Sequence, residues 1–163
     1  MGWLALRSML WAILLPGILA GYVPWRFYGL RELRFDWTNP LQYVGLACCA
    51  TGAALLAYCI WEFAQRGRGT LSPLDPPRTL VVRGLYRYVR NPMYLSVALV
   101  LVGELVLVPS RAFLLYALIW FACANGFVIG YEERALRARF GSAYEQYKRS
   151  VPRWLPAPNR RLP

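Results

Sequence analysis

The apolar run from Tyr43 to Phe63 limits what this chain can fold into. It carries no charged residue before Glu62, and about 20 apolar residues in a helix are enough to cross a bilayer. Three further apolar runs lie at about residues 3–23, 91–108 and 113–130. The sequence therefore predicts an all-α, polytopic integral membrane protein with about four transmembrane helices.

The connections between the runs indicate how they are arranged. Only Pro109, Ser110 and Arg111 separate the last two runs, which predicts a tight antiparallel helical hairpin. The first run is interrupted by Pro16 and Gly17. A cleaved signal peptide is an alternative interpretation of that first run, although its broken apolar core is a poor match to one.

The charged residues lie in groups between the apolar runs. The chain has 163 residues, of which 58% are hydrophobic, and a formal net charge of +11. Of its 19 Lys and Arg residues, 15 fall near the N-terminus, in the 64–91 loop or from Arg134 onward. Short basic segments of membrane proteins favour the cytoplasm, whereas a nucleic-acid-binding protein would interleave its basic residues with the fold. We therefore expect a multi-pass protein of the bacterial inner membrane, with both termini in the cytoplasm and no nucleic-acid partner.

Histidine and cysteine usage limits the chemistry. The chain has no histidine, which excludes the usual general base, the usual zinc ligand and every Ser–His or Cys–His pair. The four cysteines lie inside apolar runs without CxxC spacing, so we expect neither a metal site nor a disulfide framework. Small residues at helical spacing, such as Gly45 with Cys49, permit close helix packing within or between chains. The oligomeric state stays open.

The segment after the fourth run alternates apolar and charged residues with a helical period. We expect an amphipathic helix over residues 132–151, lying on the membrane face or over the 64–91 loop. Gly141 is the position at which this helix would bend. The apolar residues that define its face are Leu136, Phe140, Tyr144, Tyr147 and Val151.

Several polar residues stand where a membrane helix alone does not need them. Glu104 lies deep in the third run, where carboxylates are costly and are functional candidates; a neutral structural hydrogen bond is the alternative. Glu132 and Glu133 follow the fourth run and oppose the helix dipole. They either pair with nearby arginines or bind ribose hydroxyls or a cationic ligand. Gly67 and Gly69 in the long loop allow close approach of a ligand, although glycine in a loop is common.

Three stretches in a fixed order carry a more specific signal: TLVVRGLYRYVRNPMY from Thr79, the acidic pair, and FGSAYEQYKRSVPRWLP from Phe140. Together they resemble the membrane methyltransferases of the isoprenylcysteine carboxyl methyltransferase and phosphatidylethanolamine N-methyltransferase superfamily. The resemblance covers about Phe63 to Pro156, more than half of the chain. It implies that S-adenosylmethionine binds between the 64–91 loop, the base of the last helices and the C-terminal helix.

The resemblance also implies which residues contact the cofactor. Aromatic rings such as those of Tyr86 and Tyr94 can face a sulfonium cation. Glu104 and Arg90 are the candidate catalytic residues, either in contact with the acceptor or bracing the site. The residues expected to bind the cofactor are Gly67, Gly69, Arg78, Thr79, Leu80, Val81, Tyr86, Asn91, Pro92, Met93, Tyr94, Glu132 and Glu133.

Two positions depart from the pattern of the superfamily. Its common Arg-His-Pro is Arg-Asn-Pro at residues 90–92, a form that resembles the phospholipid branch. Asn91 can form hydrogen bonds but cannot titrate. Val128 stands where the prenylcysteine enzymes place a substrate-binding arginine, which weakens the case for a carboxylate acceptor.

The reaction that the resemblance implies suits a chain without histidine. Methyl transfer from a sulfonium mainly requires alignment of donor and acceptor and exclusion of water. We therefore expect an S-adenosylmethionine-dependent methyltransferase that acts on a lipid-like or hydrophobic acceptor (carboxylate, amine or thiol) at the cytoplasmic face, among membrane lipids. Two alternatives stay open: an NADPH-dependent enzyme resembling sterol reductases, and a non-catalytic scaffold whose arginines bind anionic lipids.

Overall fold

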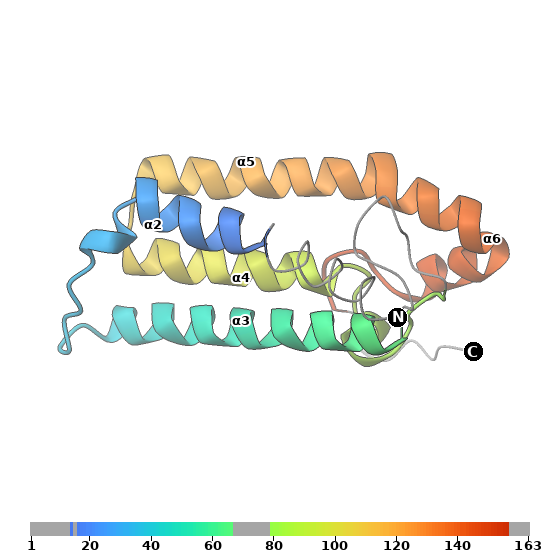
Figure 1. Ribbon diagram of the computed structural model, residues 1–163, viewed down its shortest axis with the longest axis horizontal. Coiled ribbons are helices and arrows are strands. Elements are labelled where there is room, and N and C mark those ends of the chain that lie inside the picture. Colours follow the sequence, from blue (N-terminus) through green and yellow to red (C-terminus); the bar gives the residue numbers. More distant parts are fainter. Residues whose placement is uncertain (1–13, 15, 67–78, 157–163) are drawn as a thin grey trace.

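Three long helices form the frame of the molecule. The computed structural model describes residue 14 and residues 16–66 and 79–156, and none of these residues lies in a β-strand. The helices are α3 (Pro40–Arg66), α4 (Pro92–Leu107) and α5 (Arg111–Phe127). They alternate in direction, and α4 lies between α3 and α5 (Figure 1). Val108, Pro109 and Ser110 connect α4 to α5, which confirms the predicted hairpin.

The contact between α3 and α4 depends on glycine. A Cβ atom on Gly103 of α4 would lie 2.6 Å from both the Cys49 Sγ atom and the Gly45 carbonyl oxygen of α3. A Cβ on Gly52 would similarly lie 2.7 Å from the Ser96 carbonyl oxygen. Such distances leave no room for a side chain, so small residues bring the two backbones together. The small-residue spacing seen in the sequence therefore serves packing within the chain.

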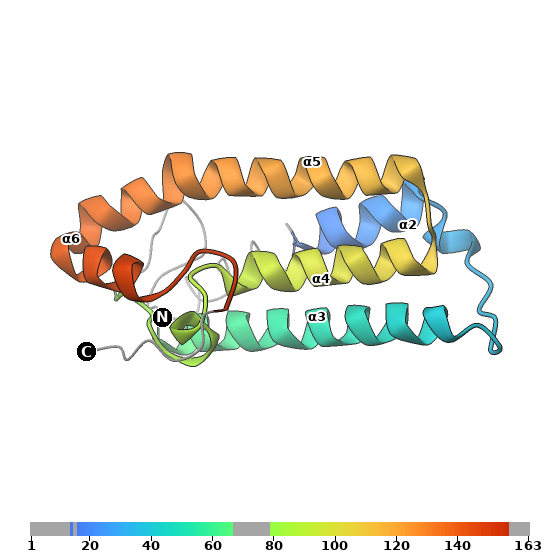
Figure 2. The ribbon, with the colours of Figure 1, turned by 180° about the vertical axis from the view of Figure 1, so that it is seen from behind.

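The short N-terminal helices complete the bundle. The π-helical turn η1 (Ile18–Tyr22) and α2 (Val23–Phe27) lie along α4 and α5 (Figure 2). The Tyr116 hydroxyl of α5 donates a 2.6 Å hydrogen bond to the Leu19 carbonyl oxygen. The rings of Tyr28 and Phe113 stack with centroids 5.0 Å apart. The 3₁₀ turn η2 (Leu30–Glu32) follows α2, and the buried residues at this core are Ala20, Val97, Leu101 and Phe113.

The C-terminal part of the chain folds back toward the bundle. Helix α5 continues through the π-helical turn η4 (Val128–Glu132) into α6 (Glu133–Ser150). Gly141 interrupts α6 with φ +50° and ψ −123°, a conformation that favours glycine, so the predicted bend is confirmed. Beyond the bend, Tyr144 and Tyr147 are buried and pack against Leu80 and Val82 of the loop. The second half of the amphipathic helix therefore packs on the described last part of the loop, residues 79–91.

The outer surface of the bundle is apolar. Pro40–Glu62 and the continuous helix Arg111–Ser150 are long and apolar enough to cross a membrane. Leu41 and Trp61 of α3 and Leu118 of α5 are among the large apolar side chains that stay exposed. Helix α4 is apolar but has 16 residues, about 24 Å at the usual helical rise. The first expected span lies largely outside the described residues, so four spans stay a prediction.

Candidate functional site

The candidate site lies at one end of the bundle, called here the loop end. It is formed by the 3₁₀ turn η3 (Gly84–Arg87), the start of α4, the turn η4, the bent α6 and the tail that follows it. Figure 1 shows these elements gathered beyond the same ends of α3, α4 and α5. Segments far apart in the sequence therefore meet here, as the resemblance implies.

Glu132 faces α4. The Tyr94 hydroxyl donates a 2.6 Å hydrogen bond to Glu132 Oε1. Burial raises the pKa of Glu132 above its usual range and the charge of Glu133 adds to this, although the hydrogen bond from Tyr94 opposes it. Glu132 closes the π-helical turn η4, and single π turns inside α-helices are frequent at functional sites. A half-buried carboxylate is thus held between two helices of the bundle.

Glu133, the next residue, faces a group of cations instead. Arg90 Nη1 donates to its Oε1 atom at 3.0 Å and Arg153 Nε at 2.7 Å, and Lys148 Nζ lies 3.6 Å from Oε2. Burial alone would raise the pKa of Glu133, but the hydrogen bond from Arg153 and the charges of all three cations outweigh it, so the pKa is lowered. Glu133 is therefore ionised and binds three basic residues of the loop end at once.

Arg90 joins the loop to the tail. Its side chain is 9% exposed, and its Nη1 also donates to the Tyr144 hydroxyl at 3.2 Å. Its backbone N–H donates to the Pro152 carbonyl oxygen at 2.9 Å. The buried Nε atom has no hydrogen-bond partner among the residues that the structure describes. An N–H donor is thus left in place for an anionic or carbonyl group.

Aromatic rings surround Tyr94. Its ring centroid lies 6.5 Å from that of Trp120 and 6.3 Å from that of Trp154, the latter edge to face. The Trp154 indole N–H donates a 2.9 Å hydrogen bond to Asn125 Oδ1, which fixes the tail against α5. Phe121 lies 5.0 Å from Trp154 between ring centroids. Rings beside a carboxylate favour a cationic ligand.

Most of the described candidates gather at the loop end. Asn91 Nδ2 donates to the Arg153 carbonyl oxygen at 3.4 Å, and Pro92 begins α4. The Tyr86 carbonyl oxygen accepts a 2.7 Å hydrogen bond from the Tyr147 hydroxyl. Met93 is the second residue of α4. Three more candidates precede η3 in the loop: Thr79 is exposed, Leu80 is half-buried and Val81 is buried. The candidates Gly67, Gly69 and Arg78 lie outside the described residues.

Glu104 does not join this cluster. It lies 12 residues after Pro92 on α4, about 18 Å along the helix axis at the usual rise. The residue is 8% exposed, and its Oε2 atom has no hydrogen-bond partner among the described residues. A catalytic role for Glu104 stays a prediction, and the geometry of the loop end gives it no part in binding a ligand there.

Sequence reasoning did not single out several residues of the loop end. Arg153, Trp154 and Asn125 reach the site because the tail folds back, and a tail gives no local signal of where it will dock. Glu62 is 4% exposed at the end of α3, and its Oε2 atom lies 3.4 Å from where a Cβ on Gly84 would be. In the sequence, Glu62 could have been noticed as the first charged residue of the apolar run that forms α3.

Comparison with known families gives a match that includes much of this region. A sequence model described as phospholipid methyltransferase matches residues 40–143, more than half of the chain. The chain belongs to the phospholipid methyltransferase family. It is also similar to an "Uncharacterized protein" of Haemophilus influenzae, with 36% identity over 63 residues, which cover 39% of this chain and all of the relative. No solved structure matches.

Membership of the phospholipid methyltransferase family has consequences for the site. The family implies a methyltransferase, and with the two long apolar helices it indicates a membrane protein. The matched region contains Arg90, Tyr94, Glu132 and Glu133, whereas Arg153 and the rest of the tail lie beyond it. The family match thus spans the acidic pair and the start of α4, whereas the docking of the tail against α5 is seen in the structure.

Proposed function

We propose that this protein transfers a methyl group from S-adenosylmethionine to a lipid-like acceptor at the cytoplasmic face of a membrane. The family supports methyl transfer, and the outward-facing apolar residues of α3 and α5 support an acceptor dissolved in the bilayer. The observation that carries the proposal is the juxtaposition of Glu132, the Tyr94 ring and Arg90 at the loop end. The acidic group suits the amino group or ribose hydroxyls of the donor, the aromatic ring suits its sulfonium, and the basic group suits its carboxylate.

The residues of the loop end fit such a donor. Its amino acid part carries a carboxylate, for which the buried Arg90 Nε offers an unused N–H. Its sulfonium is a cation, which the rings of Tyr94, Trp120 and Trp154 can face. Glu132 can accept hydrogen bonds from an amino group or ribose hydroxyls. When bound, S-adenosylmethionine supplies a methyl group that leaves its sulfur as the bond to the acceptor forms, and the bonding electrons stay on the sulfur.

The chain's own contribution is to bind, orient and exclude water. Tyr94 holds the Glu132 carboxylate in place, and Glu133 holds Arg90 and Arg153. Trp154 closes the tail over α5. Alignment of two reactants and their removal from water lower the barrier to displacement, so no histidine is required. A protonated acceptor would release its proton to water.

Titration calorimetry in detergent tests the donor. We expect the wild-type protein to bind S-adenosylmethionine and to give no heat with NADPH. Glu132→Gln removes the negative charge at the site, and we expect it to weaken binding about tenfold or more, since hydrogen bonds to charged groups contribute about 1.5–3 kcal/mol. Glu145→Gln is the matched control, because Glu145 pairs with the exposed Arg137 on α6. Binding of NADPH in place of S-adenosylmethionine would support the reductase-like alternative, and binding of neither would support the scaffold.

A further inference from the structure

A surface hollow lies beside the loop end, on the side of α3. It has a volume of about 470 Å³ and is lined by Leu55, Tyr58, Gly84, Leu85, Arg87 and Tyr88. Cavities that bind small organic ligands measure about 300–1,000 Å³, so the hollow has the size of a binding site. Its walls come from the C-terminal half of α3 and from the turn η3.

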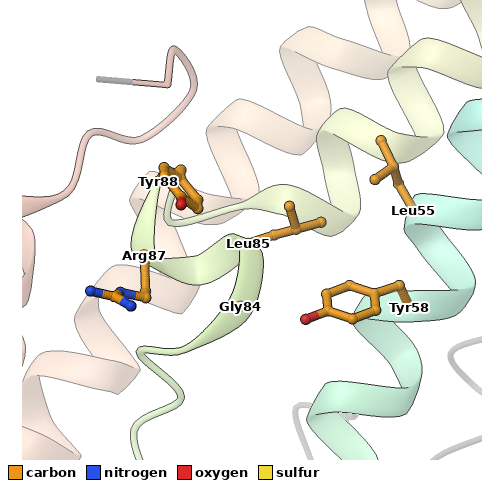
Figure 3. Close-up of a pocket in the computed structure, with 6 residues that line it drawn as sticks. All are labelled: Leu55, Tyr58, Gly84, Leu85, Arg87 and Tyr88. Atoms are coloured by element: carbon orange, nitrogen blue, oxygen red, sulfur yellow. The ribbon is translucent and has the colours of Figure 1, made fainter. Parts of the chain in front are cut away.

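The inner wall of the hollow is apolar. In Figure 3 the Leu85 side chain points toward Leu55, and the Tyr58 ring points toward Gly84. Gly84 has φ +56°, and a Cβ there would lie 2.7 Å from the Tyr58 hydroxyl oxygen. Only glycine permits both this backbone conformation and this approach. The turn is therefore held against α3, and Leu85 faces an apolar wall that continues along the exposed side of the helix.

The outer edge of the hollow is basic. The Arg87 guanidinium extends away from the leucines in Figure 3, and it makes no hydrogen bond or ion pair with any residue that the structure describes. Arg83, just before the turn, is also exposed. Apolar side chains inside and an uncommitted cation at the edge match a molecule with an acyl chain and an anionic headgroup.

The turn that lines the hollow also contacts the candidate donor site: Tyr86 lies between the lining residues Leu85 and Arg87, and its carbonyl oxygen accepts a hydrogen bond from Tyr147 of α6. Burial raises the pKa of the Tyr86 hydroxyl, and the nearby Cys59, Tyr147, Glu132 and Glu62 raise it further. The Tyr86 hydroxyl is thus within electrostatic reach of the α3 acid on one side and of Glu132 on the other.

We infer that this hollow binds the phospholipid acceptor, with one acyl chain against Leu55 and Leu85 and the phosphate beside Arg87. The inference rests on the proposed function, because an acceptor site beside η3 has meaning only if methyl transfer takes place at the loop end. It assigns to α3 and η3 a role in binding the acceptor, distinct from the donor groups of α4, η4 and the tail.

Native mass spectrometry of the detergent-solubilised protein tests the site without requiring activity. We expect the wild-type protein to retain added dioleoyl phosphatidylethanolamine, to retain dioleoylglycerol more weakly, and to retain no glycerol 3-phosphate, because both chain and phosphate contribute. Leu85→Trp fills the hollow, and Arg87→Ala removes the phosphate partner. We expect Arg87→Ala to reduce retention about tenfold or more, the range for the loss of one hydrogen bond to a charged group. We expect Leu85→Trp to reduce it severalfold, because the indole fills the space for the acyl chain.

The matched control is Leu115→Trp, on an exposed position of α5 remote from the hollow. It should retain lipid as the wild type does, and thermal unfolding should show that all three variants are folded. In a methyl-transfer assay, Leu85→Trp should raise the apparent KM for lipid and leave the affinity for S-adenosylmethionine unchanged. Equal retention by Leu85→Trp, Arg87→Ala and the wild type would overturn the inference. Absence of any methyl transfer by the wild type would instead count against the proposed function, with the retention result still standing on its own.

Discussion

At the scale of single residues, the two adjacent acids have different surroundings. Glu132 accepts a hydrogen bond from Tyr94, and burial raises its pKa. Glu133 is surrounded by Arg90, Arg153 and Lys148, which lower its pKa. Adjacent residues on a helix point in directions about 100° apart, so the two carboxylates have separate partners. We therefore propose that Glu132 binds the ligand and that Glu133 positions the basic residues around it.

Tyr94→Phe tests the first assignment. Loss of the hydroxyl removes the donor that orients the Glu132 carboxylate, and we expect the affinity for S-adenosylmethionine to fall by about three- to tenfold, as for a hydrogen bond of about 1 kcal/mol. Calorimetry measures the change. Tyr43→Phe is the control, since the Tyr43 hydroxyl donates to the Trp37 carbonyl oxygen at the opposite end of the bundle. An equal loss in both variants would contradict the assignment.

Glu133→Gln tests the positioning role of Glu133. The Arg90 and Glu133 side chains are each 9% exposed, and breaking a buried ion pair costs about 3–5 kcal/mol. We expect a clear loss of stability near neutral pH in thermal unfolding. Glu145→Gln should change little, because Glu145 and Arg137 form an exposed pair with side chains 38% and 54% exposed.

The pH dependence of stability offers a separate readout of Glu133. Its pKa is lowered in the folded protein, so its stabilising contribution is complete above the unfolded value of about 4.3 and is lost as the pH falls through the folded pKa. We expect the stability difference between the wild type and Glu133→Gln to shrink as the pH falls below about 4. A stability difference that stays constant down to the pH at which the protein unfolds would contradict an ionised Glu133 that binds the basic residues.

At the scale of elements, the frame rests on the close approach of α3 and α4. Gly45, Gly52 and Gly103 allow backbone contact that larger residues would block. The bend at Gly141 then brings the second half of α6 onto Leu80 and Val82. In the tail that follows, the Arg153 carbonyl oxygen accepts a hydrogen bond from Asn91, and the Trp154 indole donates one to Asn125. The position of the loop end thus depends on three glycines of the α3–α4 contact and on Gly141 within α6.

Gly103→Ala tests the importance of the α3–α4 contact. The added Cβ would lie 2.6 Å from the Gly45 carbonyl oxygen, which is backbone and cannot turn aside, so we expect destabilisation of about 1–3 kcal/mol. Gly126→Ala on α5 is the matched control, because no atom lies within 4 Å of its added Cβ and alanine favours a helix. Thermal unfolding should show a lower midpoint for the first variant and an unchanged or higher midpoint for the second.

The sequence predicts the elements better than their meeting points. The short connection at Pro109 and Ser110, the helix start at Asn91-Pro92 and the bend at Gly141 all follow from local chemistry of proline and glycine. By contrast, the separate partners of Glu132 and Glu133 depend on where α4 and the tail lie. The same holds for the tail, since nothing in the residues near Trp154 indicates α5 as its partner.

At the scale of the whole molecule, the two ends of the bundle differ. The loop end carries more basic residues, among them Arg87, Arg90, Lys148 and Arg153, than the opposite end, where Arg31 lies in η2 and Arg111 begins α5 (Figure 2). Between them the surface is apolar. A basic end on an apolar bundle is typical of a protein whose basic face lies at the cytoplasmic surface.

Cysteine labelling in spheroplasts tests this orientation. Arg34 and Arg149 are exposed at the opposite end and the loop end respectively. We expect a membrane-impermeant maleimide to label Arg34→Cys in intact spheroplasts and Arg149→Cys only after permeabilisation. The wild type, whose own cysteines lie on α3 and α5, gives the background. Labelling of Arg149→Cys from outside would contradict a cytoplasmic loop end.

The most direct test of the function uses S-adenosylmethionine labelled on its methyl group. Purified protein is incubated with the labelled donor and vesicles of a total lipid extract, and the label in the lipid fraction is counted and identified. We predict that the wild type and Glu145→Gln transfer label to a lipid and that Glu132→Gln transfers less than about a tenth as much, in line with the contact to a charged group. No labelled lipid with the folded wild type, or equal labelling by Glu132→Gln, would contradict methyl transfer at the loop end.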